Sequence, residues 1–407
     1  MGQTAVIPAQ IVDVAAKSLL GNNTASIDAA QTVSWSAAST GDVLTVQGDG
    51  TVAFAAPSGG IGGSTGSTDN AVLRADGTGG ATLQTSGWIV PDIYTASPNA
   101  TVNHLSLQAT GSSTNVSVSI VPKGTGAFSL QVPDGTSAGG NARGANAVDL
   151  STSRSTAAQI ASGAHSFQAG RNLTASGQGS VAFGDNNTST SFYTFVAGQD
   201  NSVTGSSASA IAYQSTASGS RAGVYASENS TASGTHAVVL GGLRSTASAS
   251  YARALGNQAV ADRYGMTAEA SGSWFSNVHG HAQHVRCTLR NKTTTNSAVT
   301  LFLDGASARL TIPSGKILHA TVHIVGSKSD GTAVASYMRQ VTIKNVGGTT
   351  SLVGTVNTIG TDEAASTSMA ITADDTNDAL DIAVTGIASE TWRWAATVHG
   401  IEIAYGS

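Results

Sequence analysis

The sequence predicts an all-β protein built from stacked coils, and three observations support this prediction. Residues 161–270 repeat with a period of about fourteen, with small residues at fixed positions of each repeat. Glycine contributes 48 of the 407 residues, and only 11% of residues are charged, against about 25% in ordinary globular domains. A hydrophobic share of 40% with a net charge of −5 lies outside the composition of disordered chains. We therefore expect order to arise from repetition and from the assembly of several chains.

Residues 1–30 are predicted to be an attachment peptide. Apolar residues recur at roughly helical spacing over residues 9–21, which predicts one short helix. The chain begins without the basic and apolar regions of a secretory signal, and no apolar run approaches the eighteen or so residues of a membrane-spanning helix. We therefore expect no membrane insertion. Because the chain is mildly acidic and has no basic stretch, we also expect no nucleic-acid partner.

Residues 31–150 are predicted to form a fibrous β shaft of short hairpin units. Alternating apolar and polar residues over 43–47, then Asp49-Gly50, then Val52 and Phe54, predict one hairpin. The Gly- and Ser-rich residues 57–66 predict a flexible connector after it.

Residues 151–278 are predicted to form a parallel β-roll with coils of about fourteen residues. One position is small in every coil but the last: Gly163, Gly177, Ser191, Gly205, Gly219, Gly234, Ala249 and Arg263. The position five residues later is small or β-branched in every coil but the first: Gln168, Ala182, Val196, Ala210, Val224, Val239, Ala254 and Ala268. This alternation predicts short strands that each bury a narrow face.

Such a roll has a thin core, so we expect copies of the chain to bundle into a homotrimer. Columns of Gly and Ala bury little apolar area, and burial contributes only roughly 25 cal/mol per Å². Larger apolar side chains are expected to fill the space between the copies: Phe167, Phe183, Phe195, Ile211, Tyr225, Leu240 and Leu255.

A polar ladder is predicted at the turns of the coils. Its members are spaced by fourteen residues: Asn172, Asn186, Asp200, Gln214 and Glu228. Asp185, Asp200 and Glu228 are candidate carboxylates for glycoside hydrolysis, and at about 4.8 Å per coil the last two would lie near 9.5 Å apart, within the range of inverting enzymes. The roll lacks a groove-forming insertion and neighbouring aromatic residues, and no nucleophile elbow or zinc-spaced cluster occurs. We therefore predict that the protein is not an enzyme.

Residues 279–407 are predicted to form a β-sandwich, because longer and more hydrophobic strands follow at about ten-residue spacing. Trp392 and Trp394 share one side of a strand. We interpret them as buried anchors, with stacking on sugar rings as the alternative. Trp274 and Phe275 are expected to close the core of the roll.

Several repeats resemble a known family. Ser180-Val-Ala-Phe-Gly184, Thr174-Ala-Ser-Gly177 and Thr216-Ala-Ser-Gly219 look like the head repeats of trimeric autotransporter adhesins. The resemblance covers roughly residues 155–272 and implies a left-handed parallel β-roll in an elongated homotrimer. Similar repeats occur in bacteriophage tail fibres, and Pro122-Lys-Gly-Thr-Gly126 resembles shaft segments of such fibres.

The resemblance implies a tail fibre or tailspike in the virion. We expect its N-terminus to dock on a tail or baseplate protein. The C-terminal tip is expected to bind the host cell surface, either a glycan or a protein. Two alternatives stay open: a structural head fibre or decoration protein without a receptor role, and a glycan-degrading tailspike.

His279 and His281 are candidate metal ligands, with His284 nearby. In a trimer, two histidines from each chain would give six nitrogens on the axis, which suits octahedral iron or nickel. Some phage fibres resemble this arrangement, and the alternative is that these histidines are polar linker residues. His319 and His323, four residues apart, are expected to pack or hydrogen-bond on one strand face. No other cofactor is predicted.

Two further features receive structural interpretations. Asp374, Asp375 and Asp378 form an acidic turn with Asn377 that could bind calcium, but it lacks the loop length and distal glutamate of an EF-hand. We favour turn chemistry there. Cys287 is the only cysteine, and we expect it to be a buried small hydrophobe.

Overall fold

The computed structural model describes residues 115–274 and 278–405, together with the backbone of seven short strands before residue 115. The chain divides into two compact units, residues 1–121 and 122–407. The described residues contain no helix, and so none that could span a membrane. The all-β prediction is confirmed.

The first unit contains short antiparallel pairings. Strands β1 and β2 pair, β3 and β4 pair, and β6 pairs with both β5 and β7. Their bounds are Ser18–Gly21, Gln31–Ser34, Val43–Val46, Val52–Ala55, Ala71–Ala75, Leu83–Ile89 and Gln108–Ala109. The β3–β4 pair coincides with the predicted hairpin. The helix predicted over residues 9–21 is wrong at its end, because Ser18–Gly21 pairs as a strand; residues 9–17 lie outside the described residues.

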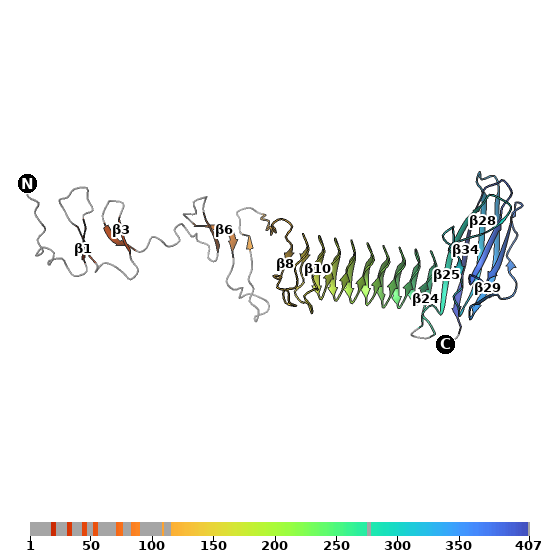
Figure 1. Ribbon diagram of the computed structural model, residues 1–407, viewed down its shortest axis with the longest axis horizontal. Coiled ribbons are helices and arrows are strands. Elements are labelled where there is room, and N and C mark those ends of the chain that lie inside the picture. Colours follow the sequence, from red (N-terminus) through yellow and green to blue (C-terminus); the bar gives the residue numbers. More distant parts are fainter. Residues whose placement is uncertain are drawn as a thin grey trace, which may run out of the picture. The chain divides into compact units, whose positions relative to one another are not determined.

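In the second unit, stacked coils form a parallel solenoid, so the predicted roll of stacked coils is confirmed (Figure 1). Each coil gives one strand to each of two parallel sheets. The longer strands are β10 (Phe167–Arg171), β12 (Val181–Asp185), β14 (Phe195–Gln199), β16 (Ser209–Tyr213), β18 (Gly223–Glu228), β20 (Val238–Leu243), β22 (Arg253–Asn257) and β24 (Thr267–Ser271), preceded by β8 (Phe128–Ser129) and β9 (Val148–Asp149). The shorter ones are β11 (Thr174–Ala175), β13 (Thr188–Ser189), β15 (Ser202–Val203), β17 (Thr216–Ala217), β19 (Thr231–Ala232), β21 (Thr246–Ala247) and β23 (Val260–Ala261).

The small positions are small because the next coil lies directly against them. A Cβ added to Gly177 would lie 1.8 Å from the carbonyl oxygen of Ser191, and one added to Gly205 would lie 2.0 Å from that of Gly219. The narrow buried column is also present, since Ala182 and the equivalent residues of later coils are fully buried. Close stacking therefore limits both columns to small side chains.

Each coil turns twice through a residue with left-handed backbone, whereas the sequence indicated one such ladder. The predicted members Asn172, Asn186, Asp200 and Gln214 lie in the first ladder, which continues with Asn229, Arg244 and Gln258; φ along it is between 49° and 61°. The predicted assignment of Glu228 to this ladder is wrong: the pairing register shifts between Ile211 and Tyr213, Glu228 pairs with Tyr213 as a strand residue, and Asn229 makes the turn. The second ladder, not predicted, is His165, Gly179, Tyr193, Ser207, Arg221, His236, Tyr251 and Gly265.

The sheet of long strands continues without a break into the C-terminal part, because β24 pairs antiparallel with β25 (Figure 1). Its further strands are β25 (Ala282–Thr293), β34 (Trp392–Ala404), β28 (Lys316–Lys328), β29 (Val334–Val346), β30 (Thr349–Leu352) and β31 (Asn357–Thr358). A smaller antiparallel sheet contains β26 (Ala298–Thr300), β27 (Leu310–Thr311), β32 (Ser368–Asp374) and β33 (Ala379–Thr385).

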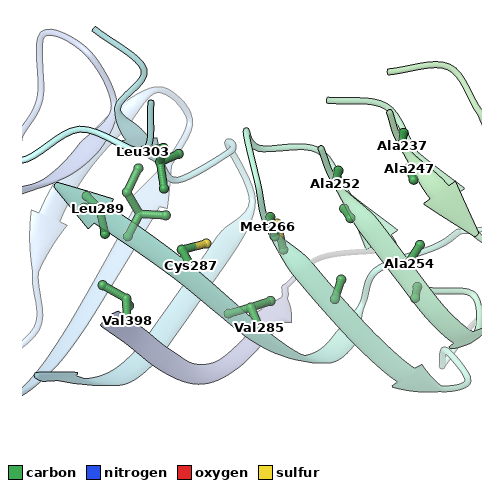
Figure 2. Packing of buried hydrophobic residues seen from close by; sticks show 14 of the residues in the cluster. Ala237, Ala247, Ala252, Ala254, Met266, Val285, Cys287, Leu289, Leu303 and Val398 are labelled. Carbon is green, nitrogen blue, oxygen red and sulfur yellow. The ribbon is translucent and has the colours of Figure 1, made fainter. Parts of the chain in front are cut away.

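One hydrophobic cluster runs from the roll into both C-terminal sheets. Figure 2 shows Ala254 and Met266 of the roll followed by Val285, Cys287 and Leu289 of β25. Cys287 is buried and unpaired, as expected. The β-sandwich and its role as a trimeric tip stay predictions.

Candidate functional site

The apolar residues predicted to lie between copies occupy two adjacent columns on the outer face of the roll's long strands, with Phe167 and Phe195 in one column and the others in the second. We call Phe167, Phe183, Phe195, Ile211, Tyr225, Leu240 and Leu255 the apolar ladder. Ile211 and Leu240 are 50% and 53% exposed, although their strand neighbours Ala210 and Val239 are fully buried. The rings of Phe167 and Phe183 lie 5.3 Å apart. Contiguous exposed apolar surface of this kind marks contact sites.

A charged cluster closes the first coil of the roll. Gln168, the polar exception in the buried column, donates Nε2 to Asp149 Oδ1 at 3.0 Å and to Ser151 Oγ at 2.9 Å. Asp149 is fully buried and pairs with Arg143 Nε at 2.8 Å and Arg154 Nη2 at 3.5 Å. The amide N–H groups of this polar exception are therefore held by the buried cluster, whereas its Oε1 accepts no hydrogen bond from the described residues.

A second charged cluster closes the last coil. The Arg263 side chain is buried and reaches Glu402 on β34, and Lys316 Nζ lies 3.2 Å from the same carboxylate. Gln283 Nε2 donates to Glu402 Oε1 at 2.9 Å and to the carbonyl of Val260 at 3.0 Å. Burial alone would raise the pKa of Glu402, but the charges of Arg263 and Lys316 outweigh it and lower that pKa. This cluster fixes the C-terminal sheet to the roll.

The structure places His279 and His281 together at the junction. Both line a cavity of about 350 Å³ with Lys316 and Tyr405. His281 is 6% exposed, and its ring lies 6.1 Å from that of Trp274. Burial lowers the pKa of His279, with added effect from Arg244 and His281, so the neutral imidazole that a metal requires is favoured. Within residues 115–274 and 278–405, three or more His, Cys, Asp or Glu side chains nowhere gather for a metal, and metal binding by His279 and His281 stays a prediction.

His284 lies on the other side of β25 from His281, on the outer face of the C-terminal sheet. Its ring packs edge to face on His399 of β34, with centroids 4.4 Å apart. His319 and His323 share this face on β28, as predicted. His319 Nδ1 lies 2.7 Å from Thr342 Oγ1.

The acidic turn is held by protein donors. Asp374 accepts from Asn377 Nδ2 at 2.7 Å and pairs with Arg309 at 3.1 Å. Asp375 and Asp378 accept from the backbone N–H and the hydroxyl of Thr350. The arrangement supports turn chemistry, as we favoured, over a calcium site.

Trp392 and Trp394 are buried anchors, not a surface for sugars. They are 0% and 2% exposed, and their rings stack at 5.6 Å. Their indole N–H groups donate to Glu390 at 2.9 Å and to Thr293 at 3.0 Å. Trp274 is 60% exposed, so it does not close the core as expected, and Phe275 lies outside the described residues.

The three carboxylates of the roll lie in two neighbouring columns, with Asp200 at the turns and Asp185 and Glu228 in the strands. Asp185 binds Arg171, and Asp200 accepts from Asn186 Nδ2 at 2.7 Å. Glu228 has moved out of the turn column into the strand column that contains Asp185, three coils away. The predicted pair, Asp200 and Glu228, stays two coils apart, because Asp200 follows Gln199 and Gln199 lies two coils before Glu228 in the strand column. At about 4.8 Å per coil this keeps a spacing of roughly 9.5 Å along the roll.

Comparison with known proteins gives remote similarities. No protein family and no curated protein matches the chain. Solved structures similar to it include the tailspike of Acinetobacter phage vB_ApiP_P1, with 11% identity, a TM-score of 0.19, and coverage of 59% of this chain and 53% of the tailspike. Another is tailspike gp49 of Acinetobacter baumannii phage Fri1, with 8% identity, a TM-score of 0.20, and coverage of 59% and 57%. A third is the tailspike of Acinetobacter baumannii phage AM24, with 7% identity, a TM-score of 0.18, and coverage of 57% and 49%.

The chain therefore spans about half the length of each of these three tailspikes. The Fri1 tailspike is described as a capsular polysaccharide depolymerase. Our prediction that the protein is not an enzyme is corrected on this finding.

Proposed function

We propose that the protein is a bacteriophage tail fibre or tailspike that forms a homotrimer and binds the host cell surface through its C-terminal sheet. One observation carries the proposal: a single sheet runs through the roll and the C-terminal part, and its outer face changes character at β25. On the roll this face carries the apolar ladder. Beyond β24 it carries mostly polar and basic side chains, with His284 paired opposite Glu269, beside the exposed aliphatic residues Val325, Val334, Val346 and Ile401. An apolar face suits contact with copies of the chain, and an open polar face suits a carbohydrate.

In this proposal the roll is a rigid spacer and the N-terminus docks on a tail or baseplate protein. Three copies of a weak binding site on one fibre would raise the overall affinity without a strong single site, because the second and third contacts become intramolecular.

The test is competition with phage adsorption. Full-length protein is added to bacteria that the phage infects, and free phage is counted over time. We expect the protein to bind the cells and to reduce adsorption. A capsule preparation incubated with the same protein is followed by size-exclusion chromatography, which detects cleavage. Protein that is present in the virion but leaves adsorption unchanged would support the head-fibre or decoration alternative and refute this proposal.

A further inference from the structure

The outer face of the C-terminal sheet is strongly cationic. We define this face as the residues of β25, β34, β28 and β29 that alternate with the buried ones. It carries five basic side chains: Arg286, Arg290, Lys292, Arg393 and Lys344. No outward position of these four strands holds Asp or Glu, although the chain has 24 acidic residues and a net charge of −5. A same-sign patch on an acidic protein attracts anions.

The cations of this face are available to a ligand. Among the described residues, the side chains of Arg286, Lys292 and Arg393 have no hydrogen-bond or ion-pair partner. Arg290 donates one N–H to the backbone carbonyl of Asp304 at 2.7 Å, which leaves its charge uncompensated. By contrast, Arg263 is paired with a buried carboxylate.

Two hollows lie along the face. The first, of about 390 Å³, is lined by Arg286, His323, Thr397 and His399. The second, of about 340 Å³, is lined by Arg290, Lys292 and Arg393 together with Asn291, Gly305 and Trp394. Because Arg286 and Arg290 are four residues apart on β25, they lie about 14 Å apart along the strand. We call these two hollows and the basic residues that line them the track. Their spacing suits a ligand chain with repeated negative charges.

We infer that this track binds an acidic polysaccharide, one with carboxylates along a carbohydrate chain. The inference rests on the proposed function, which places this sheet against the host surface. Threonine hydroxyls between the cations, at Thr288, Thr321 and Thr397, supply hydrogen bonds for sugar hydroxyls. Guanidinium groups pair with carboxylates in bidentate geometry.

Other occupants fit the face less well. No outward position of the four strands holds Phe, Tyr or Trp, so the face lacks the stacking surface on which single-stranded nucleic acids bind. A second copy of the same face would bring like charges together, which opposes association. Charge complementarity therefore favours the acidic glycan.

The experiment measures binding of full-length protein to hyaluronan, with dextran of equal length as the neutral probe, at two salt concentrations. We expect binding to hyaluronan that weakens with salt, and none to dextran. The double variant Arg286→Ala and Arg393→Ala is expected to weaken hyaluronan binding by at least 10-fold. The matched control is Arg221→Ala, which removes an exposed cation on a turn of the roll and should leave affinity unchanged.

Equal affinity of the double variant and the parent would overturn the inference, as would equal binding to dextran or tighter binding to single-stranded DNA. Circular dichroism and native mass of each variant ensure that a loss is not a folding defect. If the protein blocks phage adsorption but does not bind hyaluronan, the proposed function stands and this inference fails. If it binds hyaluronan through these arginines but never binds host cells, the proposed function fails instead.

Discussion

Arg263 Nη2 lies 2.5 Å from Glu402 Oε2, which joins the last coil of the roll to the last strand of the C-terminal sheet. Earlier coils have Gly, Ser or Ala at the position of Arg263, because the backbone of the next coil lies directly against it. No coil follows the eighth, so a long side chain fits there. The exception in the repeat is therefore the residue that ends the roll.

Removing this carboxylate should destabilise the junction. Glu402→Ala leaves Arg263 and Lys316 without their partner, and breaking a buried ion pair in this way costs about 3–5 kcal/mol. We expect the free energy of unfolding to fall by that amount in urea titrations at fixed protein concentration. Glu363→Ala, which removes an exposed carboxylate without an ion pair, is the control and should change it little.

The same pair predicts a dependence on pH. The pKa of Glu402 is lowered in the folded protein, so the unfolded chain takes up its proton first. The stabilisation is therefore complete above the usual glutamate pKa of about 4.3 and is lost as pH falls through the lower folded value. Glu402→Gln should therefore reduce the dependence of the free energy of unfolding on pH in the acidic range. A curve that overlays the parent would contradict this assignment.

A single methyl group at a marker position should disrupt the roll. In Gly205→Ala the new Cβ would meet the carbonyl oxygen of Gly219 at 2.0 Å, and the backbone cannot yield as a side chain would. We expect a loss of about 3 kcal/mol or more, at the upper end of overpacking costs. Ser206→Ala changes the next, exposed position and should leave the melting temperature within a few degrees of the parent.

Cys287 should resist thiol reagents in the folded protein. It is 2% exposed, and burial raises the pKa of its thiol to about 12, so almost no thiolate is present at neutral pH. Labelling with iodoacetamide at pH 8, followed by mass spectrometry, is expected to modify it only after denaturant is added. Rapid labelling of the native protein would show that the core around β25 opens.

The carboxyl group of Asp304 should titrate well below the usual range of an aspartate. Its side chain accepts from the backbone N–H groups of Ala306, Ala308 and Ser307, which lower its pKa to about 2. The loop is held while the carboxylate is charged, and this support is lost as pH falls through about 2. Carbon-detected NMR of the carboxyl resonance measures the midpoint, and a value near 4 would mean that these hydrogen bonds do not form.

The apolar ladder gives a prediction for assembly. If it lies between copies, Leu240→Lys combined with Ile211→Lys should reduce the native mass from about three times 40.4 kDa toward that of one chain. Ser218→Lys places the same charge at an exposed position outside the ladder and should leave the mass unchanged. Native mass spectrometry distinguishes the outcomes, and a parent protein that is already monomeric would refute the trimer.

The sequence predicted the fold correctly where the same packing constraint recurs in every coil. The columns of small residues predicted stacked coils because each coil meets the same neighbour. The second ladder of left-handed turns was missed, since Tyr193, Ser207 and Arg221 are not residue types that indicate such backbone. Glu228 was misplaced because one coil contains an extra residue, which shifts the turn to Asn229.

The cationic face could not be predicted, because its residues are far apart in the sequence. Arg286 and Arg393 share a face only through the antiparallel pairing of β25 with β34. Gln168 and Arg263 looked like breaks in the pattern, and their buried partners lie outside the repeats. The alternation of buried and exposed residues along each strand could be predicted from the sequence. Which exposed residues of different strands share a face depends on strand pairing, which the sequence alone does not show.

The two charged clusters that close the roll leave the coils between them interchangeable. Adding or removing one fourteen-residue unit there would keep every column in register and shift the C-terminal sheet by about 4.8 Å. The length of the roll can therefore change by duplication of a short stretch of sequence, without substitutions at either end. A change in the number of coils would therefore alter the length of the roll while leaving both charged clusters in place.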